Sequence, residues 1–88
     1  MATLIKTDGT LVTLKPEGPK GTLTLEQMQK AINGDIEIVR LRNGNIMVID
    51  EEGKCKGKDV NLVATDKAAL RGDYIVGDAI ICKNRDVQ

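Results

Sequence analysis

The chain has 88 residues in which 13 Lys and Arg balance 13 Asp and Glu, and this neutral charge argues against a general nucleic-acid binder, which needs a basic excess. The length predicts a single domain, residues 1–88, with one thin core. There is no Phe or Trp and only one Tyr, so the core must be aliphatic, and a small aliphatic domain is a candidate for stabilisation by self-association.

Signals for membrane insertion and secretion are also missing from the sequence. No apolar run approaches the ~18–20 residues that span a bilayer, and the first residues do not combine a charged region with a long apolar stretch. Two cysteines, Cys55 and Cys82, are too few for a disulfide scaffold. We therefore expect a cytoplasmic protein with free thiols and no membrane contact.

Residues 4–14 predict a β-hairpin. Strand-forming residues flank Asp8-Gly9, and this dipeptide supplies the positive φ angles of a tight two-residue turn. Pro16 and Pro19 mark the loop that follows.

The clearest helix signal starts at Thr24. This residue can cap the first helical turn, and Gln27 can complete a reciprocal capping box. Asn33-Gly34 then predicts the end of the helix.

Residues 36–50 predict a second hairpin around Asn43-Gly44. A two-residue turn pairs Arg42 with Asn45 and makes both faces of the hairpin apolar. One face then carries Val39, Leu41, Ile46 and Val48, and the other carries Ile36, Ile38, Met47 and Ile49 together with Arg40 and Arg42. A face in contact with water should be polar, so we expect the second face to be covered by the rest of the chain or by another copy of it.

The remaining chain predicts a charged loop at 51–58, a short helix within 61–70 and a final strand region at 74–82. Asn61 can cap this helix, although Val63 and Thr65 have low helix propensity. The Gly77-Asp78 pair predicts a bend. The fold class is therefore α+β: a small, bent, mostly antiparallel sheet of roughly five or six short strands built from hairpins, with these two helices.

The order of short motifs along the whole chain resembles one known family. The motifs are Gly34-Asp35-Ile36-Glu37-Ile38-Val39, Gly44-Asn45-Ile46-Met47-Val48-Ile49-Asp50-Glu51-Glu52-Gly53-Lys54, Asn61 followed by Ala64-Thr65, and Ile75-Val76-Gly77-Asp78-Ala79-Ile80. They resemble the family of small proteins described as domain of unknown function 3846, whose members are carried largely by phages and other mobile elements of bacteria. The resemblance implies that setting, with a bacterial host, and transfers no activity, substrate or catalytic residue.

The chain offers few groups for catalysis. It contains no His and no Ser, which removes Ser/His and Cys/His pairs and His-ligated zinc. Cys82 alternates with Ile80 and is expected in the core, and Cys55 has no neighbouring base. We expect no enzymatic activity, no catalytic residue and no cofactor.

The densest carboxylate group is Asp50, Glu51 and Glu52, with Glu37 predicted opposite Asp50. Such a group can bind a hard divalent cation, but a solvated turn balanced by the lysines that follow is the simpler interpretation. We therefore assign no metal ligand.

Two basic clusters are candidate contacts for an anion. Arg40 and Arg42 project from one face of a strand, and the lysine loop precedes a helix whose backbone N–H groups point the same way. Edge protection and solubility are the structural alternative for each cluster. The candidate ligand-binding residues are Arg40, Arg42, Lys54, Lys56, Lys58 and Asn61.

Two functions remain open from the sequence. The first is a non-catalytic protein that binds a host or phage protein stoichiometrically, through the second apolar face or an open strand edge, and so antagonises a host defence function. The second is an oligomer that sequesters an anionic nucleotide-type signal between subunits. In either case we expect a homo-oligomer, with a dimer favoured, and an interface that includes Ile36, Ile38, Met47 and Ile49.

Overall fold

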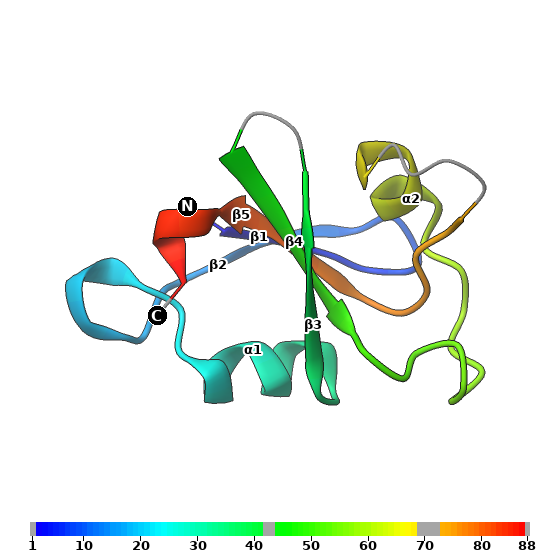
Figure 1. The fold of residues 1–88 in the computed structure, drawn as a ribbon, viewed down its shortest axis with the longest axis horizontal. Coiled ribbons are helices and arrows are strands. Elements are labelled where there is room, and N and C mark those ends of the chain that lie inside the picture. Colours follow the sequence, from blue (N-terminus) through cyan, green and yellow to red (C-terminus); the bar gives the residue numbers. More distant parts are fainter. Residues whose placement is uncertain (1, 42–43, 69–72, 88) are drawn as a thin grey trace.

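A computed structural model describes residues 2–41, 44–68 and 73–87, and its centre is a five-stranded antiparallel sheet (Figure 1). The strands are β1 (Ala2–Ile5), β2 (Leu11–Leu14), β3 (Ile36–Arg40), β4 (Asn45–Asp50) and β5 (Ala79–Lys83), in the order β2-β1-β5-β4-β3. The last strand therefore lies between the two hairpins and joins them. This architecture confirms the predicted α+β class.

Each face of the sheet is covered by one helix (Figure 1). On one face, α1 (Leu25–Ile32) buries Met28 and Ile32 in an aliphatic cluster with residues of β1, β4 and β5. On the other face, α2 (Leu62–Ala68) and the segment that follows it bury Ala64 and Ile75 in a second cluster. The described residues also form 3-10 turns at Pro19–Gly21 and Asn84–Asp86. Neither α1 nor α2, at 8 and 7 residues, is long enough to cross a membrane.

Both faces of β4 are thus covered within one chain, whereas β3 at the edge keeps Ile38 44% exposed. The predicted oligomer was based on the premise that one helix cannot cover both faces, and α2 removes that premise. The oligomeric state stays a prediction without this support.

At the start of α1, one half of the predicted capping box is present and the other half is not. Thr24 Oγ1 accepts a hydrogen bond from the N–H of Gln27 at 3.0 Å, which confirms the predicted cap. The reciprocal half of the capping box was wrong, because the Gln27 side chain binds the preceding loop instead. Its Nε2 donates to the carbonyl of Lys15 at 2.6 Å, and its Oε1 accepts from the N–H of Glu17 at 3.1 Å.

Both hairpins turn with three residues, so the predicted two-residue turns were wrong. In the second hairpin the N–H of Leu41 donates to the carbonyl of Asn45 at 2.9 Å, and Gly44 closes the loop with a φ of +75°. The first hairpin ends its loop in the same way on Gly9, with a φ of +91°. A glycine with positive φ in third position is the usual three-residue hairpin loop.

The extra loop residue shifts the register of β3 against β4 by one residue. Each side chain of β3 therefore shares a face with the β4 residues that were predicted on the opposite face. Ile36, Ile38 and Arg40 lie on the α1 side with Ile46, Val48 and Asp50, whereas Glu37 and Val39 lie on the α2 side with Met47 and Ile49. The proposed interface residues Ile36, Ile38, Met47 and Ile49 are therefore split between the two faces, and Met47 is completely buried. Since both faces are apolar, the hydrophobic pattern does not distinguish the two registers.

Asn61 joins the second helix to the sheet and to the segment after the helix. It is completely buried, and its Nδ2 donates to the carbonyls of Ile5 and Gly77 at 2.8 and 3.0 Å. Its Oδ1 accepts from the N–H of Ala64 at 3.0 Å, which confirms the predicted cap.

We predict that Asn61→Ala lowers the free energy of unfolding by about 3 kcal/mol or more, because it leaves two buried carbonyls and one N–H without partners. Urea unfolding measures this loss. The exposed Asn84→Ala is the matched control and should change stability by less than ~0.5 kcal/mol. Equal effects of the two substitutions would contradict the role assigned to Asn61.

Candidate functional site

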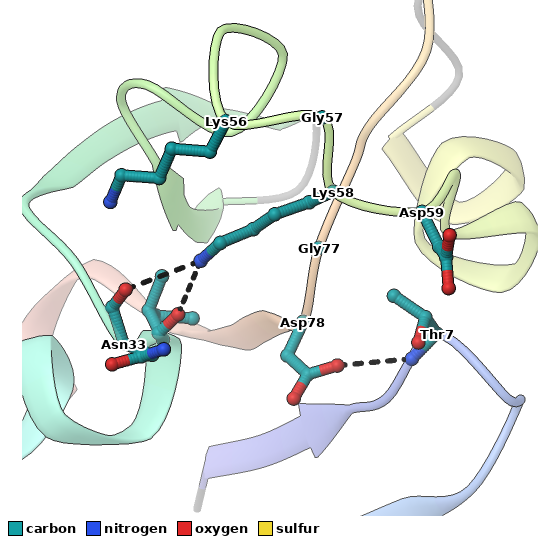
Figure 2. Close-up of a pocket in the computed structure, with 9 residues that line it drawn as sticks. Thr7, Asn33, Lys56, Gly57, Lys58, Asp59, Gly77 and Asp78 are labelled. Atoms are coloured by element: carbon teal, nitrogen blue, oxygen red, sulfur yellow. Dashed lines mark hydrogen bonds between the residues drawn. The ribbon is translucent and has the colours of Figure 1, made fainter.

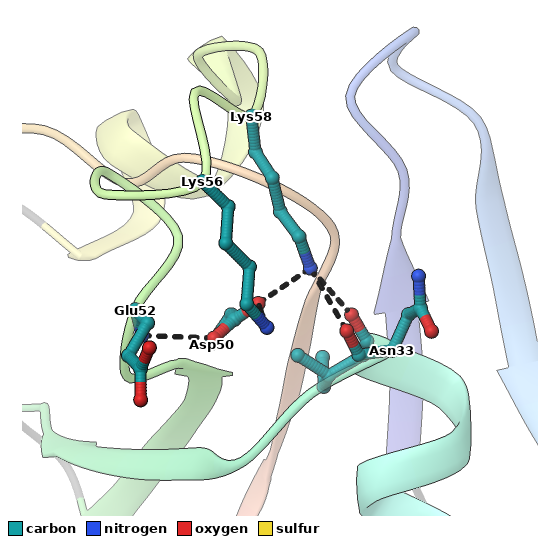
Figure 3. Close-up of polar contacts among 6 residues, drawn as sticks. Asn33, Asp50, Glu52, Lys56 and Lys58 are labelled. Atoms are coloured by element: carbon teal, nitrogen blue, oxygen red, sulfur yellow. Dashed lines mark hydrogen bonds and ion pairs between the residues drawn. The ribbon is translucent and has the colours of Figure 1, made fainter.

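The end of β4 carries a buried carboxylate that binds two lysines of the following loop (Figure 3). The Asp50 side chain has no exposed surface, and its Oδ2 lies 2.5 Å from Lys58 Nζ and 3.0 Å from Lys56 Nζ. Its Oδ1 accepts a hydrogen bond from the N–H of Glu52 at 2.8 Å. The carboxylate is therefore ionised and satisfied on both oxygens.

The charge of Asp50 is stabilised by these contacts against the cost of burial. Burial raises the pKa of Asp50, but the hydrogen bonds from Lys58, from the N–H of Glu52 and from Lys56 outweigh it and hold the pKa at about 2. The same hydrogen bond from Lys56 to Asp50 raises the pKa of Lys56.

Lys58 also closes the end of α1. Its Nζ donates to the carbonyls of Ile32 and Asn33 at 3.0 and 3.3 Å, so the ammonium lies at the negative end of the helix (Figure 3). Gly34 leaves the space for the ion pair of Lys56 with Asp50, since a Cβ there would lie 2.6 Å from Lys56 Nζ and 2.7 Å from Asp50 Oδ2. One ammonium thus connects α1, β4 and the loop.

Beside this network lies a pocket of about 450 Å³, called the lysine pocket (Figure 2). Its lining includes Asn33, Lys56, Lys58, Asp59, Asp78 and Thr7. Both lysines already bind Asp50, and the other two charged residues are carboxylates, of which Asp78 accepts from the N–H of Thr7 at 3.0 Å. The pocket therefore has no excess of positive charge with which to bind an anion.

The remaining candidate anion contacts do not join this pocket. The Lys54 ammonium lies 2.5 Å from Asp73 on the opposite side of the sheet, and the amide of Asn61 is fully used inside the protein. Arg40 is exposed on β3, and Arg42 lies outside the described residues. The structure consequently brings only Lys56 and Lys58 together, on a carboxylate of the protein itself.

The acidic residues do not converge either. The register places Ile36 opposite Asp50 and Glu37 opposite Ile49, so the predicted pairing of Glu37 with Asp50 was wrong. Within the described parts of the chain, no three acidic or Cys side chains are arranged to hold a metal ion.

A second hollow, which the sequence did not predict, lies between the β3–β4 hairpin and residues 73–76. This Tyr74 groove has a volume of about 190 Å³. Its apolar floor is Val39, Ile49, Ile75 and Val76, its rim is Glu37, Glu51, Lys54, Cys55, Asp73 and Tyr74, and Asp50 also lines it. Three segments distant in sequence form it, so no local spacing indicated it.

The two cysteines occupy different environments. Cys82 is buried in the α1-side cluster, which confirms the predicted core position, and burial raises the pKa of its thiol to about 11. Cys55 is exposed at the rim of the Tyr74 groove.

The described residues form a small α+β domain in which an open antiparallel sheet carries one helix on each face. A family model described as "Domain of unknown function (DUF3846)" matches residues 3–88, so the chain belongs to that family. No curated protein and no solved structure matched the chain.

We predict that Asp50→Asn is most destabilising at neutral pH and that this penalty shrinks by about 2 kcal/mol between pH 6 and pH 2. The folded-state pKa of about 2 lies below the ordinary value of 3.8, so the carboxylate stabilises the fold above pH 3.8 and loses this effect as the pH falls towards 2. Urea unfolding across that range measures it. Asp66→Asn, on the exposed side of α2, is the surface control and should change stability by less than ~0.5 kcal/mol at pH 7, and a penalty for Asp50→Asn that does not change with pH would contradict the prediction.

We also predict that Lys58→Met costs about 2 kcal/mol of stability or more, because two carbonyls and a buried carboxylate lose a donor. Lys56→Met removes one contact of a lysine whose side chain is 40% exposed, and should cost less than ~1 kcal/mol. The two variants are compared by urea unfolding at pH 7. A larger loss of stability for Lys56→Met than for Lys58→Met would show that Lys56, and not Lys58, connects the loop to α1 and β4.

Proposed function

We propose that this chain is a non-catalytic binding protein that takes an extended segment of a protein partner as an additional strand against β3. The observation that carries the proposal is the open edge of β3 beside the Tyr74 groove. In such complexes the main-chain hydrogen bonds provide affinity, and pockets for alternate side chains provide specificity.

The free side of β3 offers unpaired backbone groups. β3 pairs with β4 on one side, and no described strand pairs with its other side. Alternate residues of an antiparallel strand direct their N–H and C=O groups away from the neighbouring strand. The hydrogen bonds at the two ends of the hairpin, from Leu41 to Asn45 and from Glu51 to Asp35, set this alternation. The outward groups are therefore those of Ile36, Ile38 and Arg40.

The Tyr74 groove favours β3 over β2, the other edge strand, although β2 also exposes the apolar side chains of Leu11 and Val12. Ile38 is 44% exposed, so an added strand would gain an apolar neighbour on the α1 side. On the α2 side, Glu37 and Val39 line the Tyr74 groove, so the added strand would place alternate side chains beside a hollow. β2 is one residue shorter and does not line this groove.

The setting implied by the family resemblance completes the proposal. The partner would be a protein of the bacterial host or of the phage, in the cytoplasm, and occupancy of its segment would antagonise a host function by stoichiometric binding. This step rests on analogy between related proteins and on no contact in the structure.

Sequestration of an anionic nucleotide-type signal has less support from the geometry. Lys54, Lys56 and Lys58 each bind a carboxylate of the protein, and a ligand would have to replace those contacts. Arg40 is the one charged member of the candidate anion set, within the described residues, for which no such contact is found.

We predict that peptides of about eight residues, selected from a random display library on the immobilised full chain, bind along β3. Ile38→Pro removes an outward N–H without breaking the β3–β4 ladder, and should weaken their binding roughly tenfold or more. Calorimetry with the selected peptides measures the loss, and protection of the Ile38 and Arg40 amides from hydrogen exchange maps the contact.

The matched control is Leu11→Pro, which removes an outward N–H from β2. It should leave peptide binding unchanged. Failure to enrich any peptide, or equal binding by the Ile38→Pro variant, would sink the proposal. Saturable binding of a nucleotide in the same calorimeter, lost on Arg40→Ala, would favour the anion alternative instead.

A further inference from the structure

We infer that the Tyr74 groove is a cation site, filled in this structure by the protein's own Lys54, and that it receives a lysine or arginine side chain of the partner segment. The inference deepens the proposed function and rests on it for the source of the cation. The sequence predicted a ligand of opposite charge here, since it made Lys54 a candidate contact for an anion.

The position of Lys54 shows that the groove accommodates a cation. Its Nζ lies 4.4 Å from the centroid of the Tyr74 ring and 2.5 Å from Asp73 Oδ1. An ammonium over an aromatic face and beside a carboxylate is held from two directions. Asp73 raises the pKa of Lys54, and Tyr74 and Glu37 add to the shift.

The rim retains negative charge after Lys54 is counted. Four acidic residues line the groove beside one ammonium, and Asp50 is paired with Lys56 and Lys58, which leaves Glu37, Glu51 and Asp73. Within the described residues Lys54 pairs with Asp73, whereas Glu37 and Glu51 make no ion pair. The groove therefore attracts a cation more strongly than an anion or a neutral group.

The shape of the groove suits a long basic side chain. Its floor is apolar, and the methylene stem of a lysine or arginine can lie on such a floor while the charged end stays at the rim. Lys54 is itself a replaceable occupant, because its side chain is 50% exposed and that of Asp73 is 54% exposed. An ion pair this open to water is exchanged readily.

The groove also lies where an added strand would deliver such a side chain. Glu37 and Val39 point to the α2 side of β3 and form the near wall. In a paired strand the residues opposite Glu37 and Val39 point to the same side, within direct reach of them. A basic residue at one of these positions meets Glu37 first and the Tyr74 ring beyond it.

The test uses single-residue probes on the full chain. We titrate ¹⁵N-labelled protein with Nα-acetyl-arginine methylamide and with the neutral Nα-acetyl-norleucine methylamide, at low salt. The arginine probe should shift the amides of Glu37 and Tyr74, and the norleucine probe should bind more weakly. Lys54→Met removes the internal occupant and should tighten arginine binding by about threefold, while Glu37→Gln should weaken it.

Lys56→Met is the matched control, because it removes a lysine of the same loop that binds Asp50 and does not line the groove. It should leave probe binding unchanged. The inference is overturned if Lys54→Met leaves arginine binding unchanged or weaker, or if norleucine binds equally well.

The proposed function and this inference fail separately. Selected peptides that bind β3 without any preference for a basic residue would leave the proposed function standing and overturn the inference. Conversely, the arginine probe needs no strand edge, so its binding should survive Ile38→Pro. If the probe binds and no peptide does, the cation site stands, but its assignment to a partner strand is overturned.

Discussion

The buried Asp50 carboxylate is the contact on which the site-forming half of the molecule depends. A fully buried charge is tolerated only when it is paired and hydrogen-bonded, and Lys58, Lys56 and the N–H of Glu52 fulfil that condition. Because the Lys58 ammonium that Asp50 binds also donates to the carbonyls of Ile32 and Asn33, the Asp50 carboxylate helps to position the end of α1. The loop between β4 and α2 is thereby tied to the rest of the chain.

This tie also shapes the Tyr74 groove on the other side of the sheet. The N–H of Lys58 donates to the carbonyl of Gly53 at 3.1 Å, and Gly53 lies so close to Val76 that a Cβ would be 2.8 Å from its side chain. The loop is therefore folded back against residues 73–76, and Lys54 reaches Asp73 and Tyr74. A network buried on one face of the sheet thus fixes the rim of a hollow on the other.

Three lysines spaced two apart in one loop consequently have three different roles. Lys58 is a structural group whose side chain is 20% exposed, Lys56 is a more exposed partner of the same carboxylate, and Lys54 lies over an aromatic ring. A basic cluster in the sequence becomes two lysines bound to one buried carboxylate and a groove with an acidic rim. This arrangement gives an anionic ligand little free positive charge in the lysine pocket, and the proposed partner segment is expected to present apolar and basic groups to β3.

The sequence by itself determined the elements whose signals lie within a few residues. The Thr24 cap, the Asn61 cap, the two hairpins and the α+β class all depend on contacts between near neighbours, and the structure confirms them. The register of the hairpins was decided only by the tertiary structure, because Asn43-Gly44 fits a two-residue or a three-residue loop and both faces of β3 and β4 are apolar. The single shift that resulted placed Ile36 and Ile38 beside Asp50 on the α1 side and Glu37 on the side of Tyr74. The pairing of Lys58 with Ile32 and of Lys54 with Tyr74 joins residues 26 and 20 positions apart, and only the packing of both helices on the sheet brings such residues within reach of each other.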